Sequence, residues 1–214
     1  MFLVPALICC ETADPEPDHR SQYDRYDGYW IHYDTRYDMP CCPDDYFIAF
    51  HGRSEEKVMK AVEKEGFSCT TEPGFSSLAY MFDEEYPLYE DFSYMGFMDI
   101  SGKGDVSKIP DVIFSNNLYQ FDGRKIGHTF LFTVTYDKNN EKDEIARIVG
   151  YARERNLVPI GKGSVFAPIF LLACTDRSDG NPLEMCNWFM EETEFTYAEP
   201  MFVDEAFPIG PFPW

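Results

Sequence analysis

A histidine and a glycine, His51 and Gly52, end an apolar run of the sequence, and Ser54 follows two residues later. An imidazole can donate or accept a hydrogen bond near neutral pH, and a glycine leaves its backbone open to a ligand. Near the C-terminus, Glu192 and Glu194 stand two residues apart. In a strand, this spacing puts both carboxylates on one face, where they could stabilise a developing positive charge. The residue types therefore indicate a ligand site with hydrogen-bonding groups and paired acids.

Spacing excludes several other chemistries. GKGD at 102–105 and GKGS at 161–164 lack the GxxxxGK[ST] loop that holds phosphate, and neither HExxH nor GxSxG occurs. The chain has only 4 histidines, so few catalytic triads can be built. Two plainer interpretations stay open: a histidine at a strand end is often structural, and a pair of glutamates can be a solvated face.

The stretch from His51 to Phe67 combines a strand end, His-Gly, a serine, a one-stripe helix and Gly-Phe. This pattern resembles the first motif of ADP-ribosyltransferases of the poly-ADP-ribose polymerase and diphtheria-toxin type. The resemblance implies that NAD is the substrate and that His51, Gly52 and Ser54 bind it. The imidazole of His51 would bind the adenine-side ribose, and the backbone of Gly52 would bind the nicotinamide amide.

The same resemblance implies roles for four further residues. In GFSSLAYMF (74–82), Phe75 or Tyr80 would stack on nicotinamide. Glu194 would be the catalytic carboxylate, and Glu192 would assist the acceptor. A carboxylate at this place would hydrogen-bond the nicotinamide ribose and stabilise the charge that grows as nicotinamide leaves.

The elements that would position these residues can be predicted from periodicity. Ser54 is expected to cap a helix with an apolar stripe of Val58, Ala61 and Val62, which ends at Gly66. A second helix is expected after Asn139 or Asn140, because apolar residues recur there at helical spacing. Strands are expected at 46–50, 128–136, 164–174 and 191–200, with Pro168 interrupting the third, while 72–110 is expected to form a long loop or short strands.

Together these elements predict an α+β fold with a β-rich antiparallel or mixed core, two or three short amphipathic helices, and a split sheet like that of ADP-ribosyltransferases. The expected organisation is an N-terminal arm at 1–45 and a single domain at 46–214. The arm repeats Tyr-Asp at residues 23, 26, 33 and 37. We expect it to be irregular and packed across the domain, or to bind a partner, because tyrosine provides contact area at low entropic cost.

Composition gives a competing functional hypothesis. The chain has 38 acidic and 18 basic residues, for a net charge of −20. This charge repels nucleic-acid phosphates and attracts basic surfaces. The alternative to an enzyme is therefore a non-enzymatic acidic interaction protein, which acts as a nucleic-acid mimic or as an inhibitor of a basic partner, as in phage–host conflict.

The 7 cysteines include two adjacent pairs and fit neither a disulfide framework nor a CxxC zinc pattern. We therefore expect no metal site and a reducing, cytoplasmic location. The first ten residues are apolar but lack a basic start and are too short to span a bilayer, which favours a buried strand over a signal peptide. No membrane partner is expected.

Overall fold

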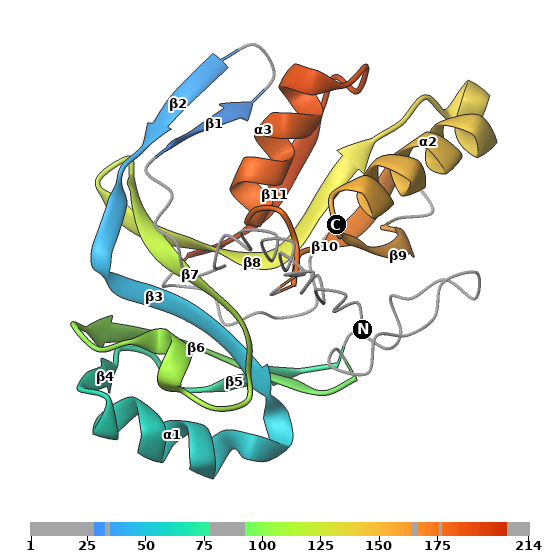
Figure 1. The fold of residues 1–214 in the computed structure, drawn as a ribbon. Helices are drawn as coiled ribbons and strands as arrows, with labels where there is room; N and C mark the ends of the chain where they lie inside the picture. Colours follow the sequence, from blue (N-terminus) through green and yellow to red (C-terminus); the bar gives the residue numbers. More distant parts are fainter. Residues whose placement is uncertain (1–27, 33–34, 78–92, 164–166, 176, 205–214) are drawn as a thin grey trace, which may run out of the picture.

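The computed structural model describes residues 28–32, 35–77, 93–163, 167–175 and 177–204 (Figure 1). Its strands are β1 (Gly28–His32), β2 (Thr35–Met39), β3 (Cys41–His51), β4 (Phe67–Cys69), β5 (Gly74–Ser76), β6 (Met95–Gly102), β7 (Val112–Phe121), β8 (Arg124–Thr135), β9 (Val158–Lys162), β10 (Ile169–Ala173) and β11 (Ala198–Asp204). Its α-helices are α1 (Glu55–Lys64), α2 (Glu141–Glu154) and α3 (Pro182–Glu192). The expectation of a β-rich α+β fold with few helices is confirmed.

Residues 41–121, called here the first repeat, run β3, α1, β4, β6, a 3₁₀ turn (Val106–Lys108) and β7. Their strands lie in the antiparallel order β4-β6-β3-β7. The first strand of the repeat is thus central, and its last strand lies beside it. The short β5 also pairs with β6.

Residues 124–204, the second repeat, run β8, α2, β9, β10, α3 and β11, in the antiparallel order β9-β10-β8-β11. If the strands of each repeat are numbered in chain order, both repeats read 2-3-1-4 within one nine-stranded sheet, which the pairing of β7 with β8 makes continuous. This is the order of the ferredoxin-like split β-α-β arrangement. The chain therefore contains two tandem copies of one topology, and a 3₁₀ turn replaces the second helix in the first copy.

The two repeats join through a hairpin and an aromatic stack. The end of β7 pairs with the start of β8 over Tyr119–Phe121 and Arg124–Ile126. Phe97 of β6 stacks on Phe47 of β3 at 6.1 Å between centroids and on Phe130 of β8 at 6.4 Å. These rings belong to one large core cluster that extends through both repeats.

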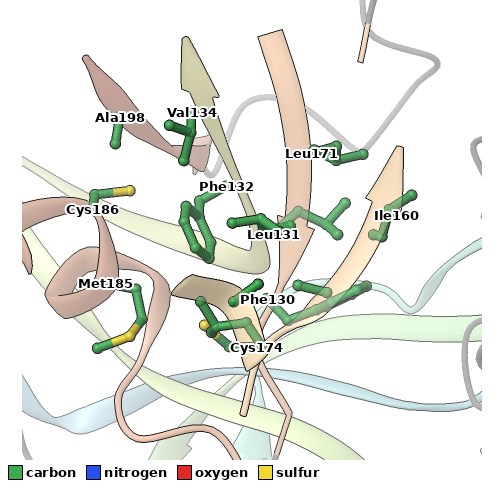
Figure 2. Close-up of a cluster of buried hydrophobic side chains, with 14 of the residues drawn as sticks. Phe130, Leu131, Phe132, Val134, Ile160, Leu171, Cys174, Met185, Cys186 and Ala198 are labelled. Atoms are coloured by element: carbon green, nitrogen blue, oxygen red, sulfur yellow. The ribbon is translucent and has the colours of Figure 1, made fainter. Parts of the chain in front are cut away.

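Each repeat buries one face of its sheet under its own helices. Alternate side chains of β3, Ile48 and Phe50, pack with Val58 and Val62 of α1 in a separate core. In the second repeat, Figure 2 shows Phe132 and Val134 of β8 on the side of Cys186 of α3, and Leu131 on the opposite side. This alternation follows from the two-residue period of a strand.

The helix predictions for α1 and α2 are confirmed, but neither N-cap residue, Ser54 or Asn140, caps its helix through its side chain. Ser54 occupies the N-cap position of α1, but its side chain does not cap the helix. Gly66 follows α1 with a φ of 86°, a left-handed conformation that glycine adopts at low cost.

The prediction of a strand at 191–200 is wrong. Helix α3 continues to Glu192, and β11 begins only at Ala198. Asn181 starts α3 through a capping box with Glu184, and Pro182 stands in the first turn. This pattern is a sequence signal for a helix start that was missed. Likewise, Pro168 precedes β10 and does not interrupt it.

The described part of the predicted arm is a regular hairpin, β1–β2, and not an irregular segment. The side-chain amide of Asn187 in α3 binds the backbone of β1: Oδ1 accepts from the N–H of Ile31 at 3.0 Å, and Nδ2 donates to the carbonyl of Tyr29. The predicted domain boundary at 45/46 falls within β3, whose first residue is Cys41. The expected strand at 1–10 lies outside the described residues.

A buried polar network lies beside the junction of the repeats. His128 is fully buried, and its Nε2 is 2.7 Å from Nδ2 of Asn116, while its Nδ1 is 3.0 Å from the carbonyl of Thr129. Tyr119 donates to Oδ1 of Asn116, which fixes the amide so that Nδ2 faces the ring. Because an amide nitrogen can only donate, Nε2 must accept, and the imidazole is neutral. Burial lowers the pKa of His128 to about 4.

This network predicts acid sensitivity. The unfolded histidine takes up a proton near pH ~6.5, whereas the folded one resists it down to about 4, so stability is full above the unfolded pKa and falls as the pH drops. Between pH 7 and pH 5 we expect the unfolding free energy of the wild type to fall by about 2 kcal/mol more than that of His128→Gln. Urea denaturation at the two pH values measures this difference. Equal losses in both proteins would contradict it.

Candidate functional site

His51 lies at the rim of the first repeat, where β3 leaves the sheet. Its backbone N–H donates to the carbonyl of Asp111 at 3.0 Å, and it stands opposite Met95 of β6. The residue precedes a 3₁₀ turn (Gly52–Ser54) that leads directly into α1. The chain thus changes from a buried strand to an exposed helix within three residues, which places the His51 side chain half-buried at the rim.

A polar cluster forms around Asp111, which precedes β7. Its carboxylate accepts from Nζ of Lys57 at 2.9 Å. Hydrogen bonds from Lys57 and then from Ser54 lower the pKa of Asp111, and the nearby His51 acts in the same direction. The Ser54 hydroxyl therefore donates its hydrogen bond to the Asp111 carboxylate and does not cap the start of α1.

An aromatic pair covers Gly52. The N–H of Gly52 donates to the carbonyl of Tyr94 at 3.0 Å, and a Cβ at this position would meet the Tyr94 ring at 2.6 Å. Tyr94 stacks on Phe75 at 5.8 Å with an interplanar angle of 14°. Phe75 is 39% exposed and Tyr94 43%, and among the described residues these two are the large hydrophobic side chains most open to solvent.

The register of the sheet explains why these rings meet. Phe75 of β5 and Phe50 of β3 both pair with Gly96, from opposite sides of β6. Gly96 has no side chain, so the Phe50 ring lies across it, and a Cβ there would meet that ring at 2.3 Å. Phe75 then contacts Phe50 edge-to-face at 6.3 Å. A ring packed over a strand glycine stabilises the strand and brings the aromatics together.

The structure thus gathers four of the residues predicted to bind cofactor, His51, Gly52, Ser54 and Phe75, at one rim of the first repeat. We call the rim formed by His51, Gly52, Phe75 and Tyr94 the aromatic rim. Tyr80, the other candidate for stacking, lies outside the described residues. The backbone N–H expected to bind nicotinamide is already bonded to Tyr94.

The two predicted catalytic carboxylates lie in the second repeat. Glu192 is the last residue of α3, and Glu194 follows it in the segment before β11, so the two do not share a strand face. Glu194 accepts from Arg147 at 2.7 Å and from Tyr151 at 2.9 Å, both on α2. Figure 1 shows α2 and α3 at the opposite end of the molecule from α1 and the turn after β3. Glu194 therefore does not join the aromatic rim.

The pKa of Glu194 is lowered, first by its own backbone N–H and then by Tyr151 and Arg147. The carboxylate is consequently held ionised by groups of the second repeat, in the way expected of a structural ion pair.

Three residues of this region were missed by sequence reasoning: Tyr94, Lys57 and Asp111. Tyr94 lies two residues before Gly96 in the run SYMGFMD, and a tyrosine beside a Gly-aromatic strand is a signal for ring-over-glycine packing. Lys57 and Asp111 stand 54 positions apart, so no local pattern could have paired them.

No cluster of three His, Cys, Asp or Glu side chains with metal-binding geometry occurs in the described ranges. Within the same part of the chain, no helix has the length and apolar character to cross a membrane. Comparison of the chain with protein-family models, with curated proteins and with solved structures gave no match.

The close packing at Gly52 predicts a specific sensitivity. In Gly52→Ala the new methyl group would displace the Tyr94 ring, and we expect a loss of about 1–3 kcal/mol in unfolding free energy. Gly74→Ala is the matched control, because nothing lies within 4 Å of its Cβ position. Chemical denaturation of both variants tests this. A Gly52→Ala variant as stable as Gly74→Ala would show that the ring moves away freely.

Proposed function

We propose that this chain is a non-enzymatic acidic protein that binds a partner with a basic surface, and that the aromatic rim is the centre of the contact. The observation that carries the proposal is the stacked, exposed pair of Phe75 and Tyr94 on a protein of net charge −20. Aromatic side chains are enriched in the cores of protein interfaces, and tyrosine is enriched among the residues that contribute most to binding energy.

The ion pairs within the chain support the proposal that the excess negative charge is available to a basic partner. Many lysines and arginines of the described residues are paired with acids of the same chain: Lys57–Asp111, Lys60–Glu56, Lys108–Asp105, Lys125–Asp45, Arg147–Glu144, Arg147–Glu194, Arg155–Asp179 and Lys162–Glu141. These pairs hold seven of the 18 basic residues, and the chain as a whole has 20 more acids than bases, 38 against 18. Such a field steers basic partners toward the protein.

The aromatic pair suits the same partner. A guanidinium group stacks on aromatic faces and is drawn to their negative centres. An arginine-rich segment would therefore be attracted over long range by the acids and held at short range by Phe75 and Tyr94. Proteins that bind nucleic acid present such basic surfaces, so action as a nucleic-acid mimic is one form of this function.

Binding to an oligo-arginine peptide, followed by fluorescence anisotropy, tests the proposal. We expect the affinity to fall steeply from low to high salt, because the attraction is spread over exposed charges. Replacing Phe75 and Tyr94 together by alanine should weaken binding about tenfold and leave the salt dependence unchanged. An oligo-lysine peptide should bind more weakly and lose less in the double variant.

Matched charge variants locate the contact. Glu55→Gln with Glu72→Gln removes two exposed acids in the segments that carry Gly52 and Phe75, whereas Asp143→Asn with Glu154→Gln removes two exposed acids on α2. Both pairs change the net charge equally, but we expect only the first to weaken binding markedly. Equal effects, together with an unaltered affinity in the aromatic double variant, would contradict binding at the rim.

Our second proposal is that NAD binds at the aromatic rim. It is supported by the proximity of four residues at this rim: His51, Gly52, Ser54 and Phe75. An imidazole beside two exposed rings offers hydrogen bonding and stacking to a dinucleotide. ADP-ribosyl transfer from NAD would also require a carboxylate at the reacting ribose; Glu194 and Glu192, the residues predicted for that role, lie away from the rim, so this proposal covers NAD binding and not transfer.

Thermal unfolding with NAD separates binding from catalysis. A ligand that binds the folded state raises Tm by mass action, so NAD should raise it in the wild type and not in His51→Ala or Phe75→Ala. Because Glu194 is held by Arg147 and Tyr151, we expect Glu194→Gln to keep the NAD shift. Release of nicotinamide by the wild type that is lost in Glu194→Gln would support the transferase, and the absence of any Tm shift would remove NAD from consideration.

A further inference from the structure

Three sulfur atoms from three different elements meet on the helix side of the first repeat. The Sγ of Cys69, at the end of β4, lies 3.8 Å from the Sδ of Met59 on α1 and 3.8 Å from the Sδ of Met98 on β6. Met98 is buried, whereas Met59 and Cys69 are half-buried. The cluster is thus anchored in the core and remains open to solvent on one side.

The separations suit a single metal ion. Metal–sulfur bonds of about 2.3 Å in a trigonal plane place the sulfurs roughly 4 Å apart. The two observed separations, 3.8 Å each, come close to this arrangement. A metal bound to the Cys69 sulfur could therefore reach each of the two thioether sulfurs.

The donor set selects the kind of metal. Thiolate and thioether ligands favour soft ions such as Cu(I), and thioethers are poor ligands for hard cations. A monovalent ion with one thiolate and two thioethers forms a site of zero net charge, which a partly buried, apolar surrounding tolerates. Zn²⁺ with the same ligands would leave a positive charge there.

We propose that Met59, Cys69 and Met98 form a three-sulfur site for Cu(I). On binding, the Cys69 thiol loses its proton to solvent as the sulfur–copper bond forms, and the two thioethers donate lone pairs without any change of oxidation state. Because methionine is absent from the usual zinc patterns, the sequence motifs of cysteine alone gave no sign of this site.

Ag(I), which shares these ligand preferences and does not change oxidation state, is the probe. In protein labelled with ¹³C at the methionine methyl groups, we expect the signals of Met59 and Met98 to shift together on Ag(I) addition, and that of Met95 to stay in place. Met95 is a suitable reference because it is buried in the other core cluster. Cys69→Ser should abolish both shifts, and Zn²⁺ should cause neither.

Competition with a chromophoric Cu(I) chelator then measures affinity under anaerobic conditions. Met59→Leu and Met98→Leu leave every thiol in place and nearly conserve side-chain volume, so the protein should fold. Each should lower the affinity of this site at least tenfold, and Met95→Leu should not. The proposal is overturned if the Met59 and Met98 signals do not move once Ag(I) has saturated the thiols. Wild-type affinity in both leucine variants would equally overturn it, because binding would then need the thiol alone.

Discussion

The ring of Phe97, held between Phe47 and Phe130, couples the two halves of this protein. Each repeat has helices or a 3₁₀ turn on one face of its sheet, so the other face must be covered by something else. The stack shows how this is done for the first repeat: Phe47 and Phe97, which alternate with the residues facing α1, form one stack with Phe130 of β8 in the second repeat.

This arrangement leaves the rims of the sheets as the places where side chains can reach a ligand. In the first repeat the rim after β3 carries a polar cluster around Asp111 and an aromatic pair over Gly52. The corresponding turn of the second repeat, between β8 and α2, begins with Asp137, whose carboxylate accepts from the N–H of Asn139. The connection between the first strand and the first helix therefore forms only a local turn in the second repeat, whereas in the first repeat it forms part of a surface with exposed aromatic rings.

Helix α1 links the two proposed sites of the first repeat. Lys57 binds Asp111 at the rim, and Met59, two residues later, faces Cys69 on the core side. Residues two apart on a helix point in different directions, so one short helix contributes to both places. Its position is fixed by Val58 and Val62, which are fully buried against β3 and β6.

The sequence by itself determined the elements whose signals are local. The apolar stripe before Gly66 predicted α1, the alternation of phenylalanines predicted β8, and the predicted elements together indicated a β-rich α+β fold, all of which the structure bears out. The segment at 191–200 failed because its alternation imitates a strand, while the capping box at Asn181 directs the chain into α3.

Tertiary structure alone decided which residues meet. Strand register across β6 brought Phe75 to Phe50, and the pairing of β4 with β6 brought Cys69 to Met98, although these partners are far apart in sequence. Glu194, in the segment between α3 and β11, instead binds Arg147 of α2 and lies away from His51. Local patterns specify backbone conformation over one element, whereas a site needs side chains from several strands, and their order in the sheet is set by the packing of the whole core.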